Sequence, residues 1–171
     1  PANSFGYFLK GDNLGLSRNI KPNGFNPENP ASDSNAISDL SGKMRAQYHT
    51  KIINFNRQKE SINHLEILIK ELKKRNIQVV LLAPPVYATY SKFLDSNVIK
   101  RADTIVAGII AKYNCLYKNY ASDKRFDRID FHDNDHLNYN GAEKFTRMLD
   151  DEFVKPLLSG QANNNQVKVN Q

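Results

Sequence analysis

Apolar residues recur every three or four positions in three stretches of the chain, at 54–75, 96–113 and 140–154. At this spacing the side chains share one face of an α-helix and leave the opposite face to polar residues. The pattern therefore predicts three amphipathic helices. Their apolar positions are Ile62, Leu65, Ile69 and Leu72; Val98, Ala102, Ile105 and Ile109; and Ala142, Phe145, Leu149 and Phe153.

Two shorter apolar runs separate these helices. Residues 77–83 read Ile-Gln-Val-Val-Leu-Leu-Ala and end at a pair of prolines, and residues 115–120 begin with the single cysteine, Cys115, which we expect in the core. Continuous apolar runs of this length are typical of strands covered on both faces of a parallel sheet. The order of elements predicts an α/β fold in which the two strands are parallel neighbours.

The predicted helix ends carry capping residues. Asn76 follows the first helix and suits a left-handed C-terminal cap. Asp95 or Ser96 suits the N-terminal cap of the second helix. We expect Asn140 to cap the third helix, with Glu143 returning a hydrogen bond to the backbone of the cap.

The remaining chain is less regular. Residues 1–53 are rich in Gly, Asn, Pro and Ser, which favour turns, so we expect an irregular N-terminal segment there. Residues 54–158 form the α/β domain. Residues 159–171 are a polar tail with little apolar surface to bury, and we expect that tail to be mobile.

Composition and charge exclude several classes of protein. Hydrophobic residues make up 40% of the chain and charged residues 25%, as in ordinary globular proteins. No apolar run approaches the length of a membrane span, and the start of the chain lacks a signal-peptide pattern. The net charge of +6 would suit an acidic partner. The basic residues are scattered, however, and no nucleic-acid-binding motif occurs, so we expect no nucleic-acid partner.

The densest acid and base chemistry lies in residues 130–145, just before the last predicted helix. Asp133 and His136 stand three positions apart on a loop, so both side chains can reach one cleft. A carboxylate that fixes the tautomer of an imidazole makes that imidazole a general base for a hydroxyl nucleophile. Asp133 and His136 are therefore the candidate catalytic residues.

Asp133-x-x-His136, which continues as Leu-Asn-x-x-Gly-Ala into the last helix, resembles the C-terminal signature of the SGNH/GDSL hydrolases. These esterases and acyltransferases use a Ser-His-Asp triad. The resemblance covers residues 54–155. It implies a flavodoxin-like, three-layer fold of about five parallel strands, in which residues 77–83 and 115–120 are the fourth and fifth.

The nucleophile and the oxyanion hole of that family have no counterpart in this sequence. No Gly-Asp-Ser, Gly-x-Ser-His or Gly-x-Asn-Asp stretch occurs, and the Gly-Asp-Asn-Leu at residues 11–14 has no hydroxyl at Asn13. Residues 1–53 are too short for three strands and two crossovers of about a dozen residues or more each. We therefore expect a partial sheet whose N-terminal half is missing, and a chain that is inactive alone.

Within that family, the chain resembles the bacterial SGNH-like proteins related to cell-surface polysaccharide and D-alanyl-transfer enzymes. The shared features are a strand that ends in Pro-Pro-Val and an Asp-His-Leu-Asn block. This resemblance is the more specific one. It implies an ester or acylated glycan substrate, no cofactor, and an extracytoplasmic or membrane-anchored place in the bacterial envelope. Tyr87 and Tyr90, in the loop after the first strand, and Asn138 are the candidate substrate-binding residues. The two tyrosines fit equally well as a cover over the core.

Two other functions stay open from the residues. His132 and His136, with Asp130, Asp133 and Asp135 around them, offer imidazole and carboxylate ligands to a metal. The spacing matches neither the zinc-protease helix nor a calcium-binding loop, so we assign no metal ligand. The other alternative is a non-catalytic α/β interaction domain.

A partial sheet leaves apolar faces that the missing half of the fold would cover. We therefore predict that the chain alone aggregates or forms a homodimer. Sedimentation velocity over a range of protein concentrations measures this. A monomer with a cooperative, concentration-independent thermal unfolding transition would contradict the prediction.

Overall fold

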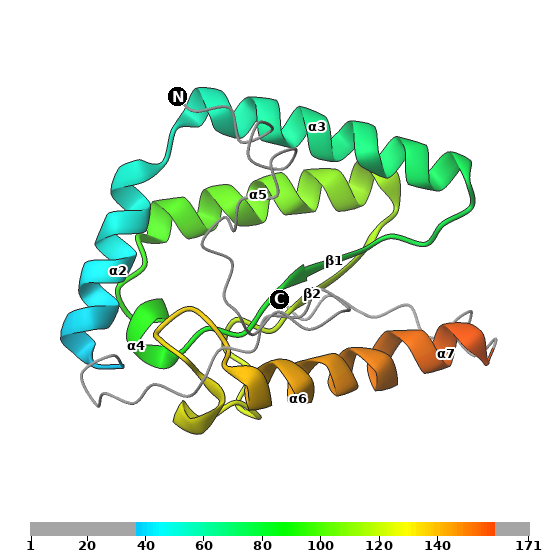
Figure 1. Ribbon diagram of the computed structural model, residues 1–171. Helices are drawn as coiled ribbons and strands as arrows, with labels where there is room; N and C mark the ends of the chain where they lie inside the picture. Colours follow the sequence, from blue (N-terminus) through cyan, green and yellow to red (C-terminus); the bar gives the residue numbers. More distant parts are fainter. Residues whose placement is uncertain (1–36, 160–171) are drawn as a thin grey trace, which may run out of the picture.

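The structure is a computed structural model and describes residues 37–159 (Figure 1). The expected irregular backbone of residues 1–36 and the expected mobile tail from residue 160 lie outside the described residues. From the amino end, the elements are α2 (Asp39–Ile52), α3 (Phe55–Lys74), β1 (Val80–Ala83), α4 (Ala88–Ser91), α5 (Ser96–Tyr113), β2 (Leu116–Asn119), the 3-10 turn η2 (Arg128–Asp130), α6 (Tyr139–Leu149), the π-helical turn η3 (Asp150–Val154) and α7 (Lys155–Leu158).

The two strands are parallel neighbours, which confirms the predicted pairing. Val80 lies opposite Leu116, and Ala83 lies opposite Asn119. One more backbone bond extends the ladder at its far end, where the Tyr120 N–H donates to the Ala83 carbonyl at 2.8 Å. The strands are shorter than the apolar runs that predicted them, and the fold is a mixed α/β arrangement around a small parallel sheet.

The main core lies between the sheet and the helix pair α3 and α5, and α6 covers the opposite side (Figure 1). Ile69 of α3 and Ile109 of α5 meet Val79 and Cys115 there, and all four are buried. The two isoleucines are large side chains at predicted apolar positions of the helices. The predicted helices 54–75 and 96–113 are therefore confirmed, as is the buried place of Cys115.

The boundaries of α3 and α5 depend on the predicted caps. Asn76 has a φ of 57°, the left-handed conformation that ends a helix. The Asp95 carboxylate accepts a hydrogen bond from the Asn97 N–H at 2.7 Å and caps the start of α5.

The last helix is less regular than the predicted single helix 140–154. After α6, the Lys155 N–H donates to the backbone carbonyl oxygen of Asp150, five residues earlier. This spacing is the π-helical pattern. This wider turn ends at Val154, two residues before Pro156, which has no N–H to donate. The chain then continues as the short helix α7.

Helix α2 corrects the prediction that residues 1–53 are irregular throughout. Ser38 and Ser41 form a capping box at its start. Its buried residues are Gly42 and Ala46, which are too small to give a clear apolar signal. Its large apolar side chains lie on the exposed side of the helix: Leu40, Met44, Tyr48 and Ile52.

Several other apolar side chains of residues 37–159 are also exposed, among them Ile67 and Leu68 on α3. Exposed apolar surface of this kind is what the predicted self-association requires, and that association stays a prediction. None of the helices in this part of the chain combines the length and the apolar content needed to cross a membrane.

Gly42 sets how closely α2 can approach α4. A Cβ at this position would lie 2.2 Å from the Thr89 carbonyl oxygen, closer than real atoms pack. We expect Gly42→Ala to lower the free energy of unfolding by about 1–3 kcal/mol, because one of the two helices must shift. Urea denaturation measures this change.

Gly108 provides the matched control, since a Cβ at this position in α5 meets no atom within 4 Å. Gly108→Ala should leave the free energy of unfolding unchanged or raise it by up to about 1 kcal/mol, because alanine favours a helix. Equal losses in the two variants would contradict the close packing of α2 on α4.

Candidate active site

The loop that carries the predicted catalytic residues is held by buried polar side chains. The carboxylate of Asp130 accepts a hydrogen bond from the Asp127 N–H at 2.9 Å and pairs with the Lys144 ammonium at 2.8 Å. A Cβ on Gly141 would lie 2.0 Å from the Asp130 carbonyl oxygen, so glycine lets the start of α6 touch the loop. The loop is thereby fixed to α6.

Asn138, and not Asn140, is the N-terminal cap of α6, which corrects the predicted cap. The Asn138 side-chain oxygen accepts a hydrogen bond from the Gly141 N–H at 3.0 Å. Its amide nitrogen donates to the carbonyls of Ile129 and Phe131. Asn140 is exposed inside the helix.

These bonds also give Asn138 a different role from the expected one. Its side chain is buried, and both ends of its amide are used within the protein. Asn138 therefore positions the loop, and we no longer assign it to substrate contact. Glu143, the predicted partner of the cap, instead pairs with Arg147 at 2.7 Å.

Asp133 and His136 form the close pair that their spacing predicted. The His136 Nδ1 atom lies 2.9 Å from each carboxylate oxygen of Asp133. Because an ionised carboxylate only accepts hydrogen bonds, Nδ1 carries the proton and the Nε2 atom of the neutral ring is left as an acceptor. The His136 side chain is 55% exposed, so the pair lies at the surface.

Asp133 is held in its ionised form. Burial acts to raise its pKa, but the hydrogen bond from His136 and those from the backbone N–H groups of residues 135 and 136 act in the opposite direction and outweigh burial. The pKa of the Asp133 carboxyl is therefore below its ordinary value. The carboxylate can accept from His136 and stabilise a positive charge on the ring.

The pair lies beyond the carboxyl ends of the two strands. In the segment that follows β1, the Val86 N–H donates to the carbonyl of Ala121, which follows β2. The next N–H, of Tyr87, donates to the carbonyl of Asn134, in the loop that carries the pair. Open parallel sheets bind ligands at this edge.

The two tyrosines expected at a substrate cleft have separate surroundings. The Tyr87 ring is half-buried and meets the Phe131 ring edge-on, with centroids 5.4 Å apart, in the second apolar cluster. The hydroxyl of Tyr90 is 2.9 Å from the His49 Nδ1 atom. Burial, and after it the nearby Asp135 carboxylate, raise the pKa of the Tyr90 phenol above its ordinary value.

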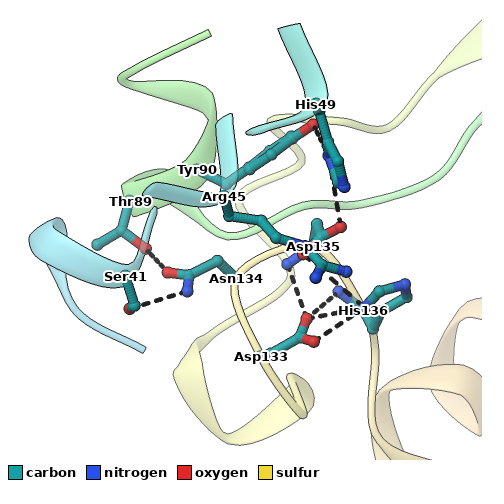
Figure 2. Close-up of polar contacts among 9 residues, drawn as sticks. All are labelled: Ser41, Arg45, His49, Thr89, Tyr90, Asp133, Asn134, Asp135 and His136. Atoms are coloured by element: carbon teal, nitrogen blue, oxygen red, sulfur yellow. Dashed lines mark hydrogen bonds and ion pairs between the residues drawn. The ribbon is translucent and has the colours of Figure 1, made fainter. Parts of the chain in front are cut away.

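Helix α2 contributes polar residues that the sequence did not reveal (Figure 2). The Arg45 Nε atom donates to Asp135 at 2.9 Å, and the amide of Asn134 donates to the Ser41 hydroxyl at 3.0 Å. With His49, these α2 residues recur every four positions. That spacing was a usable signal, but nothing in the sequence indicated which surface the stripe would face.

Asp133, Asp135 and His136 could also place one ligand atom each within 4.8 Å of one another. His132 is not in that group, and its backbone N–H donates to the carbonyl of His136 at 2.9 Å. A cation bound through His136 Nδ1 would have to displace the proton on that atom, and a cation bound through Asp135 would compete with Arg45. The existing bonds therefore favour acid and base chemistry over a metal site.

None of the serine hydroxyls in residues 37–159 forms a hydrogen bond with His136, whose ring is paired with carboxylates alone. Comparison of the chain with family models, with curated proteins and with solved structures found no match. The function is therefore inferred from the geometry of the loop.

Asn138 offers a direct test of how the loop is held. Asn138→Ala removes the cap and leaves two backbone carbonyls without their donor, so we expect the free energy of unfolding to fall by about 2–4 kcal/mol. Asn140→Ala should change it by less than about 0.5 kcal/mol. Urea denaturation distinguishes the two asparagines, and the opposite ranking would restore Asn140 as the cap.

Proposed function

We propose that this chain is the C-terminal part of a serine esterase or O-acyltransferase of the SGNH type. In this proposal it supplies the histidine and the aspartate of a Ser-His-Asp triad, and the serine lies outside these 171 residues. The observation that carries the proposal is the pair of 2.9 Å contacts between His136 Nδ1 and Asp133, which leave Nε2 as an acceptor.

Each residue of the pair has a definite role in such a reaction. The Nε2 atom of His136 takes the proton from the serine hydroxyl as the serine attacks the ester carbonyl, and later gives that proton to the leaving group. Asp133 keeps the ring in the required tautomer and stabilises the imidazolium. Its lowered pKa ensures that it is ionised when the proton moves.

The surrounding fold supports the same assignment. Two parallel strands with helices on both sides are the arrangement expected for the end of a three-layer SGNH sheet. The pair lies at the carboxyl edge, where such sheets carry their ligand sites. The proposed substrate is an ester, with acylated surface glycan as the preferred class, and the proposed location is the bacterial envelope.

The test is ester hydrolysis by a polypeptide that includes the region upstream of this chain, with p-nitrophenyl acetate as substrate. His136→Ala should lower kcat by about 10²–10⁴-fold, because it removes the general base. Asp133→Asn should lower kcat by a similar or smaller factor. Both side chains are partly exposed, so the thermal midpoint should barely change.

His64, exposed on α3, is the matched control, and His64→Ala should retain full activity. The 171-residue chain alone should show no serine-dependent hydrolysis. Full activity of His136→Ala, or serine-dependent hydrolysis by the chain alone, would refute the proposal.

A further inference from the structure

One side of α2 is directed at the loop that carries the catalytic pair. Ser41, Arg45 and His49 recur at every fourth position and therefore lie along one stripe of the helix. Figure 2 shows this stripe reaching residues 134 and 135 and the ring of Tyr90. Helix α2 packs on α4, and its polar stripe also contacts the neighbours of His136.

Asp135 is the residue on which these contacts converge. Its side chain is mostly buried, and its Oδ1 atom lies 2.9 Å from Arg45 Nε. The same oxygen lies 3.8 Å from His136 Nδ1, and the other oxygen lies 3.9 Å from His49 Nδ1. Two carboxylates therefore flank one imidazole nitrogen: Asp133 in hydrogen-bonding contact, and Asp135 about one ångström beyond that contact.

The Nδ1 atom carries one proton, so the two carboxylates compete for it. Asp133 is held in place by the backbone N–H groups of residues 135 and 136, at 3.0 and 2.8 Å. Asp135 is held by the Arg45 guanidinium. The hydrogen bond with Asp135 is also the main reason why the pKa of Arg45 is raised.

We propose that Arg45 is a positioning residue for His136. By binding Asp135, Arg45 keeps that carboxylate from reaching Nδ1, and Asp133 is left as the one acceptor of the Nδ1 proton. Without Arg45, Asp135 would be a mostly buried carboxylate with no guanidinium paired to it. Its Oδ1 atom, released by Arg45, would turn to His136 Nδ1, the imidazole nitrogen that lies 3.8 Å from that oxygen.

The consequence for catalysis rests on the proposed function. The direction of Nε2 follows from which carboxylate holds Nδ1, because the imidazole ring is rigid. A misplacement of about 1 Å at a reacting atom can lower a rate by a factor of about 100. Arg45 would thus fix the direction in which the base faces its serine.

The experiment reads the imidazole directly and needs no serine. Long-range proton–nitrogen NMR spectra of the 171-residue chain, recorded with His136 neutral, give the ratio of its two tautomers. Asp133→Asn should lower the proportion of the Nδ1–H tautomer about tenfold relative to the other, because a charge-assisted bond is lost. Adding Arg45→Met should return the ratio to within about threefold of the starting protein, since the released Asp135 accepts the proton.

Two further variants separate positioning from structural support. Arg45→Lys keeps the positive charge, so Asp133→Asn combined with it should still lose the Nδ1–H tautomer. Adding Asp135→Asn to the Arg45→Met and Asp133→Asn pair should abolish the recovery, because no carboxylate then remains next to Nδ1.

The proposal is overturned if the Arg45→Met and Asp133→Asn pair behaves like Asp133→Asn alone. It is also overturned if Arg45→Met unfolds the chain while Arg45→Lys does not, because Arg45 would then hold the helix and not the imidazole. Tautomer ratios as expected, together with an absence of ester hydrolysis in the longer polypeptide, would refute the proposed function and leave the role of Arg45 intact.

Discussion

The candidate site depends on three buried polar side chains that hold one loop from inside the protein. Asp130, Asn134 and Asn138 are 5%, 3% and 1% exposed. A buried polar group without a partner costs about 1–3 kcal/mol, and each of the three has its partners. Two residues between them can therefore reach the solvent: the same loop that buries these polar side chains leaves Asp133 30% and His136 55% exposed.

Asn134 shows how this loop connects distant parts of the chain. Its backbone carbonyl receives the Tyr87 N–H, from the segment after β1. Its side-chain oxygen accepts from the hydroxyl of Thr89 in α4, and its side-chain nitrogen donates to Ser41 in α2. One residue thus connects the loop to three segments, so that a change in α2 reaches Asp133 and His136 through few bonds.

The sequence predicts the parts of the fold that bury large side chains at regular spacing. Helices α3 and α5 do so through Ile69 and Ile109, and the two parallel strands follow from continuous apolar runs. Helix α2 escaped prediction because it packs through Gly42 and Ala46 and turns its larger apolar residues outward. Its polar contacts also join residues about ninety positions apart, and no local pattern carries that information.

The candidate site was predictable to the same limited extent. Asp133 and His136 lie three residues apart, so the local spacing was enough to pair them. Local spacing could not choose between Asn138 and Asn140 as the helix cap, because the choice depends on carbonyls of the preceding turn that only the folded loop brings to Asn138. Arg45 could not be predicted as part of the site, because its contact with Asp135 joins residues about ninety positions apart.

The most direct test of the account is covalent labelling of the longer polypeptide with a fluorophosphonate, which reacts with serines that a neighbouring base has activated. Mass spectrometry then locates the labelled residue. We expect one labelled serine, outside these 171 residues, and loss of its labelling in His136→Ala. Labelling that is unchanged in this variant, or a folded protein in which no serine is labelled, would contradict it.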